Sequence, residues 1–343
     1  MKKIILLATE PEIDPRTRKI YVSLKKHGYH PKVLYPKVKT RKGGRTISAL
    51  LRYTAYMLQI SITKADLYWV ANAPDIVAIP LFLLKRRYVY DFRSVWSKEM
   101  EAELGKTLWS RLARLIEILA MKNAKIIVLN SDTLQEDAKP YNPPSFLIPN
   151  YPLKDFKPTI PRQKFRQIHG AAEDSKIVLY VGRLSRVEGA DLIPNLIKEL
   201  SKHNTIKLWI VGGGSFQDLM KRLQKKHPKN MKYFGWQPYN QIPNFINASD
   251  VCIVPRHRDH NSPYYNEKGV LKISEYMLFK KPIVCSGIAP SNQYLLLEED
   301  NLVHGILEAL KGNAPIPTPK TWEEDAEPEL LTTLKTAFEN QNC

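Results

Sequence analysis

The chain has 343 residues, of which 43% are hydrophobic and 25% charged, so it is expected to fold into two or three globular domains with ample core. It contains no apolar run of about 18 residues, so we expect no membrane-spanning helix. Its first apolar run turns acidic after about six residues, too soon for a signal peptide.

The net charge of +18 is concentrated in one half of the chain. Residues 1–170 carry 31 Lys and Arg against 14 Asp and Glu, a net of +17, whereas residues 171–343 carry a net of +1. This asymmetry predicts an anionic partner for the first half, either a membrane surface, a phosphorylated substrate or nucleic acid. A solvated basic face is the plainer alternative, and no nucleic-acid-binding module is recognisable.

The sequence offers little sign of metal or nucleophile chemistry. Cys252, Cys285 and Cys343 have no metal-ligand spacing and form no disulfide framework, which indicates a reducing cytoplasm. The polar loop RHRDHNSP contains His257 and His260, where a solvated loop is favoured over a metal site. The phosphate-binding loop GxxxxGK[ST], HExxH and GxSxG are all absent, and without a clear Asp-x-Asp we expect no metal ion.

Apolar and amphipathic segments alternate through the first half. The expected strands are Ile4–Ala8, Lys32–Tyr35, Leu67–Val70, Tyr88–Asp91, Ile126–Leu129 and Phe146–Ile148. The expected helices are Arg16–His27, 46–61, Ile76–Leu84 and 108–121. Strand–helix alternation with short loops is typical of a doubly wound parallel sheet.

The alternation stops in a Pro- and Lys-rich stretch and then restarts. Further strands are expected at Ile177–Val181, Ile206–Val211, Met231–Phe234, Val251–Val254 and Ile283–Cys285, and further helices at Ala190–Ser201, Ser215–Lys226, Val270–Phe279 and Thr321–Phe338. The predicted architecture is α/β, with two Rossmann-like doubly wound parallel-sheet domains facing across a cleft. Its parts are a first Rossmann-like domain (1–150), a linker (151–170), a second Rossmann-like domain (171–320) and a C-terminal helix (321–343).

The segment Glu267–Ser286 carries a narrow polar stripe on an apolar helix. Lys272 and Glu275 lie three residues apart and share one helix face, while Glu267 precedes the helix in a loop. Two carboxylates so placed beside a helix N-terminus suit the two ends of a nucleotide sugar. A surface lysine–glutamate pair with an unrelated loop glutamate explains the same residues equally well.

Two strand ends in the second half carry residues suited to phosphate. Gly182 and Arg183 follow one strand, and a guanidinium can grip phosphate oxygens at two points. Three glycines, Gly212, Gly213 and Gly214, follow the next strand, where backbone can approach a ligand closely, although such a run is as often a tight turn. In open parallel sheets ligands bind at the carboxyl ends of the strands, so these junctions should converge.

Motifs in a characteristic order extend from Lys3 to about Phe338. They are DPRTRKIYVSLKKHGY (14–29), YDFRSVW (90–96), IPNYPLKDF (148–156), YVGRLSRVEG (180–189), WIVGGGS (209–215), YFGWQPYNQIPNFINASDVCIVP (233–255), LKISEYMLFKKPIV (271–284) and TWEED (321–325). Individually these motifs are modest, but in this order the chain resembles glycosyltransferase family 4, retaining enzymes of the GT-B fold that use nucleotide-sugar donors.

The resemblance implies that residues 1–150 form the acceptor-side domain, that residues 171–320 bind the nucleotide sugar and that the C-terminal helix (321–343) crosses back to the first domain. It also implies roles for individual residues. Arg183 would neutralise the donor diphosphate, Glu275 would bind the ribose hydroxyls and Glu267 the donor hexose, with Lys272 near the phosphates. The donor site would then comprise Gly182, Arg183, Gly213, Gly214, Trp236, Gln237, Glu267, Lys272 and Glu275, of which Arg183, Glu267 and Lys272 would be catalytic. The acceptor side would be lined by Asp14, Arg16, Asp91 and Arg93.

The chain departs from the family pattern at the diphosphate pocket. A lysine is usual five residues after the arginine, but this chain has Glu188, and Arg186 or Lys272 would have to compensate for the reversed charge. Ser94 stands where an aspartate is common. These departures leave open an altered donor choice or a weakened activity.

The resulting expectation is a metal-independent, cofactor-free, retaining hexosyltransferase. Its donor would be a UDP- or GDP-sugar and its acceptor a glycan or a polyprenyl-phosphate-linked lipid, in surface polysaccharide or glycoconjugate assembly. The alternative is a non-catalytic nucleotide-sugar-binding partner subunit. Residues 45–62 and 107–121 combine large apolar side chains with arginines, which suits peripheral binding to the anionic inner face of the cell membrane. Packing of these helices on the first sheet is an equally good explanation for 107–121.

Overall fold

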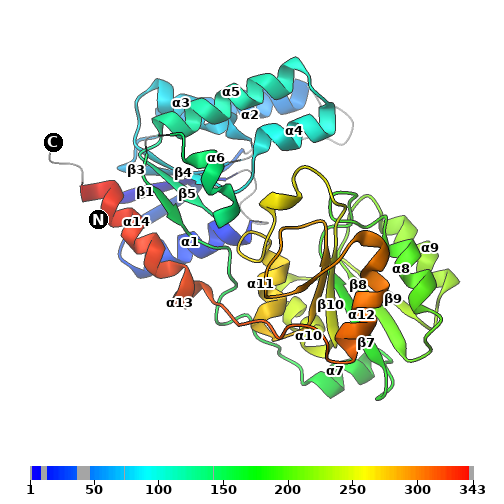
Figure 1. Ribbon diagram of the computed structural model, residues 1–343. Helices are drawn as coiled ribbons and strands as arrows, with labels where there is room; N and C mark the ends of the chain where they lie inside the picture. The colour runs from blue at the N-terminus through cyan, green and yellow to red at the C-terminus, as the bar shows by residue number, and fades with distance from the viewer. Residues whose placement is uncertain (1, 9–13, 37–46, 73, 142, 340–343) are drawn as a thin grey trace. The chain divides into compact units, whose positions relative to one another are not determined.

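The computed structural model describes residues 2–8, 14–36, 47–72, 74–141 and 143–339. They form two compact units (Figure 1). Unit 1 comprises residues 1–150 together with 322–343, and unit 2 comprises residues 151–321. The GT-B fold class predicted from the sequence is confirmed by the two six-stranded parallel sheets and by the structural neighbours reported below.

Unit 1 is built on a six-stranded parallel sheet with the strand order β2-β1-β3-β4-β5-β6. The strands are β1 (Lys3–Leu7), β2 (His30–Leu34), β3 (Leu67–Ala71), β4 (Tyr88–Phe92), β5 (Ile126–Leu129) and β6 (Ser145–Leu147). The helices are α1 (Pro15–Lys26), α2 (Ile47–Ile62), η1 (Asp75–Ala78), α3 (Ile79–Leu83), α4 (Trp96–Leu104), α5 (Leu108–Asn123), η2 (Asp132–Leu134), α6 (Gln135–Ala138), α13 (Trp322–Asp325) and α14 (Glu327–Glu339). The order reverses direction between β1 and β3, which is the topological switch point of a doubly wound sheet.

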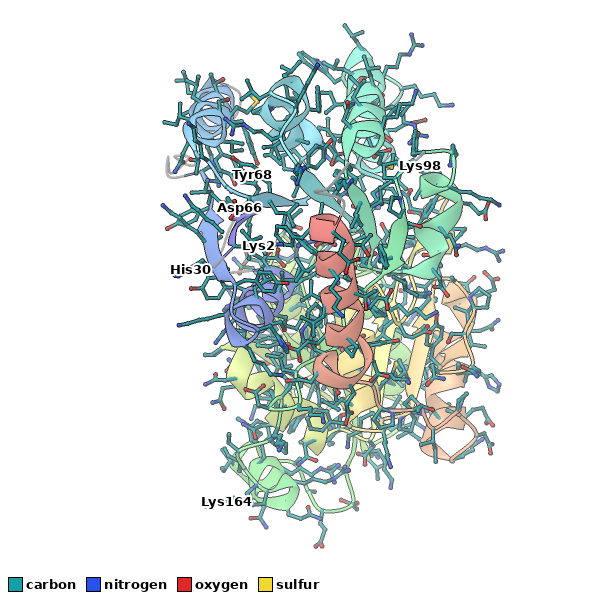
Figure 2. The ribbon with its side chains drawn as sticks, turned by 90° about the vertical axis from the view of Figure 1, so that its left-hand side faces the viewer. Lys2, His30, Asp66, Tyr68, Lys98 and Lys164 are labelled. Carbon is teal, nitrogen blue, oxygen red and sulfur yellow. The ribbon has the colours of Figure 1, made fainter. Side chains whose placement is uncertain are left out.

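The helices of unit 1 lie on both faces of this sheet. Helices α2, α3 and α5 lie on one face, and α1 and α14 on the other (Figure 1). The amino ends of β1, β2 and β3 lie side by side. The backbone N–H of Asp66 donates to the carbonyl of Lys3, and that of His30 to the carbonyl of Lys2, both at 3.0 Å. Figure 2 labels Lys2, His30 and Asp66 at this end of the sheet. Because the strands are parallel, their carboxyl ends also lie together, at the end where open parallel sheets bind ligands.

Unit 2 has the strand order β12-β11-β10-β7-β8-β9, again wholly parallel. The strands are β7 (Lys176–Val181), β8 (Ile206–Val211), β9 (Met231–Gly235), β10 (Val251–Pro255), β11 (Ile283–Ser286) and β12 (Leu295–Leu296). The helices are α7 (Arg162–Ile168), α8 (Ile193–Leu200), α9 (Gln217–Lys226), η3 (Tyr239–Gln241), α10 (Ile242–Ala248), η4 (Ser262–Tyr264), α11 (Leu271–Leu278), η5 (Glu299–Asn301) and α12 (Leu302–Leu310). Counted within the unit this is the Rossmann order 3-2-1-4-5-6, whose switch point lies between β7 and β10.

Alternating strand residues of unit 2 divide between two hydrophobic cores. Ile177 and Leu179 face one core with residues of α7, α10 and α11, whereas Val178 and Tyr180 face the other with residues of α8, α9 and α12. Because successive side chains of a strand point to opposite faces, a strand covered on both sides must be apolar throughout. This explains why these strands appear in the sequence as unbroken apolar runs.

Helices α4 and α7 are among those that the sequence analysis did not expect. Helix α4 follows β4 directly, and α7 occupies residues that were expected to form an irregular linker. Arg162 and Arg166 of α7 both pair with Asp250, at 2.6 and 2.8 Å. A contact across more than 80 residues therefore stabilises a helix whose own sequence is weakly periodic.

Candidate functional site

The glycine-rich turns after β7 and β8 pack directly on each other. Gly212 has a φ of 136°, and a Cβ placed there would lie 1.8 Å from the carbonyl oxygen of Gly182. A Cβ on Gly214 would lie 2.3 Å from the carbonyl oxygen of Leu184. A side chain at either position would clash with backbone, so these glycines are needed for the two turns to meet.

Arg183 lies at the carboxyl end of the unit 2 sheet, next to these glycine-rich turns. It follows Gly182 at the carboxyl end of β7 and is exposed, and no hydrogen bond or ion pair links its side chain to another described residue. Lys272 lies close by, since a Cβ on Gly182 would come within 2.7 Å of its Nζ. Arg183 and Lys272, both predicted from the sequence, thus lie next to the same glycine at the switch point of unit 2.

Glu275 and Glu267 occupy different environments around α11. Glu275 is 3% exposed and accepts a hydrogen bond of 2.7 Å from the hydroxyl of Tyr239. Glu267 lies in the preceding loop, where its carbonyl accepts from the hydroxyl of Ser274 at 2.6 Å. One carboxylate oxygen of Glu267 is buried and has no hydrogen-bond partner among the residues described, which leaves an acceptor for a ligand donor.

The carboxyl end of β9 adds an exposed aromatic surface. Trp236 is 70% exposed and lies beside Gly213, whose Cβ position would be 3.8 Å from the tryptophan side chain. The side-chain amide of Gln237 donates to the carbonyl of Phe234 at 2.8 Å, which fixes the turn after the strand. The donor-site residues predicted from the sequence therefore follow β7, β8 and β9 or lie on and before α11, and their roles remain predictions.

Glu188 joins this site through two cations. Its carboxylate accepts from Lys272 Nζ at 2.6 Å and from a guanidinium nitrogen of Arg256. Burial alone would raise the pKa of Glu188, but Lys272 and Arg256 lower it to about 2, so it is ionised at neutral pH. Of the two compensating cations expected, Lys272 has this role, whereas Arg186 is exposed and lies 3.7 Å from Asp191.

Arg256 and Tyr239 are the site residues that the sequence reasoning missed. Arg256 directly follows β10, the strand next to β7, so the rule that selected Arg183 could have selected it. His257, the next residue, bonds Asp191 at 3.0 Å and Glu299 at 2.7 Å through its two ring nitrogens. Throughout the described residues no group of three or more His, Cys, Asp or Glu side chains could hold a metal ion.

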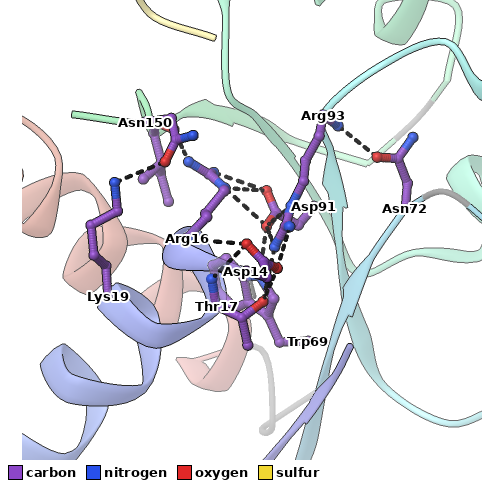
Figure 3. Close-up of polar contacts among 10 residues, drawn as sticks. Asp14, Arg16, Thr17, Lys19, Trp69, Asn72, Asp91, Arg93 and Asn150 are labelled. Carbon is purple, nitrogen blue, oxygen red and sulfur yellow. Dashed lines mark hydrogen bonds and ion pairs between the residues drawn. The ribbon is translucent and has the colours of Figure 1, made fainter. Parts of the chain in front are cut away.

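The four residues predicted for the acceptor side meet at the carboxyl ends of β3 and β4 in unit 1 (Figure 3). Asp91 lies between two guanidiniums, with contacts of 2.9 Å to both Arg16 and Arg93. Arg93 also pairs with Asp14 at 2.6 Å, and Asp14 caps the N-terminus of α1. The indole N–H of Trp69 donates to Asp91 at 3.2 Å.

Burial separates these four residues into two roles. The side chains of Arg16 and Asp91 are 2% and 0% exposed, so they lie beneath the surface and hold the others. Those of Arg93 and Asp14 are 19% and 24% exposed and can reach a ligand. Burial alone would raise the pKa of Asp14, but the Arg93 guanidinium and hydrogen bonds lower it well below its usual value. Both groups at this edge are therefore charged at neutral pH.

The donor-type geometry falls in a segment with recognisable relatives. Residues 161–311, somewhat less than half of the chain, match the family model described as "Glycosyl transferases group 1". An uncharacterized glycosyltransferase of Methanocaldococcus jannaschii is 28% identical over 127 residues, covering 36% of this chain and 30% of that protein. The chain aligns with only 28 to 54% of the length of the curated relatives that it matches.

Solved structures match the whole chain at low identity. HepE of Anabaena in complex with UDP-glucose superposes with a TM-score of 0.64 and 18% identity, covering 98% of this chain and 96% of that one. WaaG, a glycosyltransferase involved in lipopolysaccharide biosynthesis, gives a TM-score of 0.63 and 16% identity, covering 99% and 96%. These similarities establish a GT-B fold whose second unit resembles group 1 glycosyl transferases.

Proposed function

We propose that the protein is a retaining, metal-independent glycosyltransferase that moves a hexosyl group from a nucleotide sugar to a glycan or lipid-linked acceptor. The observation that carries this proposal is Arg183, which is exposed and has no side-chain partner among the described residues. It follows Gly182, the glycine that Lys272 approaches, at the Rossmann switch point and within the segment that matches group 1 glycosyl transferases. The similarity to a UDP-glucose complex supports a UDP-sugar donor, although a GDP-sugar fits the same cations. Similarity to a lipopolysaccharide enzyme supports a role in surface polysaccharide or glycoconjugate assembly.

The proposed mechanism assigns the cations to the leaving group. Arg183 and Lys272 would stabilise the diphosphate as its bond to the sugar breaks, an electrostatic contribution that needs no metal ion. Glu275 would bind the ribose, and the Glu267 oxygen that has no partner among the described residues would bind the hexose. The acceptor hydroxyl would attack from the face that the diphosphate leaves, and a phosphate oxygen of the donor would take its proton.

Donor use is the direct test of this proposal. The purified protein incubated with UDP-glucose or GDP-sugars should release the nucleoside diphosphate, and the nucleotide sugar that is used should raise the melting temperature, because ligands that bind only the folded state stabilise it. If no nucleotide sugar produces either release of the nucleoside diphosphate or a thermal shift, the proposal is contradicted. Binding without turnover, even with candidate acceptors, would instead favour a non-catalytic nucleotide-sugar-binding subunit. Glu188 supports this alternative because its carboxylate pairs with Lys272, one of the proposed phosphate-binding cations.

Unit 1 also offers a surface suited to an anionic membrane. Leu108, Trp109, Leu112 and Leu115 of α5 are 42 to 76% exposed along one helix face, while its other face is buried. Exposed leucines at the end of α3, Leu83 and Leu84, adjoin basic residues 85–87. Apolar side chains flanked by cations suit insertion at a bilayer interface. No helix among the described residues is long and apolar enough to cross a bilayer. Of the segment 45–62, which the sequence predicted to bind membrane, residues 45 and 46 are not among those that the structure describes.

Binding to lipid vesicles tests whether this surface of unit 1 binds an anionic membrane. The protein should sediment with anionic vesicles and less with neutral ones, and Trp109→Ser with Leu115→Ser should weaken binding about tenfold or more, since each buried apolar side chain contributes roughly 1.5–3 kcal/mol. Ile316→Ser is the matched control, because Ile316 is 76% exposed but lies in unit 2. The membrane proposal would be contradicted if the Trp109→Ser/Leu115→Ser variant bound vesicles as well as Ile316→Ser, or if the native chain bound none.

A further inference from the structure

Three charged side chains from separate segments of unit 2 converge beneath the turn at Gly182. Glu188 follows β7, Arg256 follows β10, and Lys272 belongs to α11. The two cations bond different oxygens of the Glu188 carboxylate. All three side chains are largely buried, with 19% of Glu188, 8% of Arg256 and 12% of Lys272 exposed.

The cations are held in place by contacts besides the carboxylate. The Arg256 guanidinium lies over the ring of Tyr265, 4.1 Å from its centroid, and Lys272 Nζ lies 4.9 Å from the centroid of Tyr180. The Nε of Arg256 is buried and makes no hydrogen bond within the described part of the chain. The pair therefore has fixed positions and spare donor capacity, which are the properties of an anion site.

In this site the anion is part of the protein. The carboxylate occupies the point on which both cations converge, and the cluster carries a net charge of only +1. Without Glu188, two buried cations would face each other with no counterion, an arrangement that strongly favours binding of an external anion. A diphosphate arriving beside Arg183 has to compete with the internal carboxylate for the same donors.

We propose that Glu188 is an internal counterion that limits the affinity of the site for diphosphates and so promotes release of the nucleoside diphosphate product. This rests on the proposed function, because the natural anion would be the donor's diphosphate. The free nucleoside diphosphate has one more ionisable phosphate oxygen than its sugar ester. Repulsion from Glu188 consequently weakens binding of the product more than binding of the donor.

A positioning role for Glu188 makes the opposite prediction. If the carboxylate served only to aim Lys272 and Arg256 at the ligand, its removal would loosen both cations and weaken diphosphate binding. The direction of the affinity change in Glu188→Gln thus separates the two roles.

Calorimetric titration with inorganic pyrophosphate, UDP and UDP-glucose tests the proposal. Glu188→Gln should bind pyrophosphate and UDP on the order of tenfold more tightly than the native chain, a change equivalent to about 1.4 kcal/mol, with a smaller gain for UDP-glucose. Glu298→Gln is the matched control, because Glu298 pairs with Arg258 at 2.6 Å on the surface of the same unit and its loss should leave affinity unchanged. Unchanged or weaker pyrophosphate binding by Glu188→Gln would overturn the proposal.

The pyrophosphate titration also separates this proposal from the proposed function. If Glu188→Gln binds pyrophosphate more tightly but no UDP-sugar binds, the donor assignment is refuted, whereas the role of Glu188 as an internal counterion is supported. If Glu188→Gln fails to fold, Lys272→Met and the double variant Glu188→Gln/Lys272→Met replace it, since neither leaves two cations facing each other. The double variant should then bind pyrophosphate more tightly than Lys272→Met, and equal affinities would overturn the proposal.

Discussion

Replacing Asp91 by Asn is expected to lower the free energy of unfolding by about 3–5 kcal/mol, the usual cost of removing one partner from a buried ion pair. The carboxylate is fully buried and accepts hydrogen bonds from Arg16, Arg93 and Trp69. Asparagine has the same shape, but its uncharged amide has one acceptor oxygen and turns a donor toward a guanidinium. Urea unfolding at neutral pH, followed by circular dichroism, measures the difference.

The control for this prediction is an exposed carboxylate of the same unit. Glu136 lies 3.5 Å from Lys139, and both side chains are more than 70% exposed. Glu136→Gln should change the free energy of unfolding by less than about 1 kcal/mol, since exposed ion pairs contribute little. An Asp91→Asn variant as stable as this control would show that the network does not hold unit 1 together.

The pH dependence of Asp91 has a definite sign. Burial alone would raise its pKa, but Arg16 and Arg93 lower it below the usual value of 3.8. A carboxyl whose pKa is lower in the folded state stabilises the fold at pH values above its unfolded-state pKa. That stabilisation is lost as the pH falls through the folded-state pKa. The gap in stability between the native chain and Asp91→Asn should therefore shrink in acid.

The strands were predictable because the sheets are parallel and covered on both faces. Expected and observed bounds agree within about two residues for Ile206–Val211, Ile126–Leu129 and their neighbours, since such strands are apolar throughout. Helix α4 was missed because its sequence, WSKEMEAEL, is polar and its N-terminus depends on a distant group. Buried Glu117 of α5 accepts from the backbone N–H and the hydroxyl of Ser97, at 3.1 and 3.2 Å. Contacts between helices do not show in local periodicity.

The candidate site also has a part that could be predicted from the sequence and a part that could not. Arg183 and the glycines could be selected because each directly follows a strand, and parallel strands bring their carboxyl ends together. The pairing of Glu188 with Arg256 could not, because it joins residues 68 positions apart and depends on β7 and β10 being neighbours. The sequence showed a reversed charge at position 188 and offered Lys272 as one of two compensating cations, which the structure pairs with Glu188. Arg256 is the second cation, and only the strand order brings it to Glu188.

Arg183→Ala should lower kcat for donor turnover by about 10²–10³-fold, the effect of removing one preorganised charge or donor from a developing anion. The guanidinium is exposed and makes no hydrogen bond or ion pair with the described residues, so its loss should leave the melting temperature unchanged. A fall in activity would then report on the reaction and not on folding. Turnover of the nucleotide sugar, followed by release of the nucleoside diphosphate, is the measurement.

Arg186→Ala is the matched control for this variant, because it removes a guanidinium only three residues away. Arg186 is 83% exposed, and among the described residues its side chain pairs only with Asp191. Its removal therefore changes the net charge of the unit equally without altering the carboxyl end of β7. Long-range electrostatic effects on donor encounter should be similar in the two variants and should weaken in salt. A loss in kcat specific to Arg183→Ala, persisting at high ionic strength, would place the Arg183 charge at the leaving diphosphate. Equal activity of the two variants would remove Arg183 from the mechanism and leave Lys272 and Arg256, both bound to Glu188, as the cations available to the leaving group.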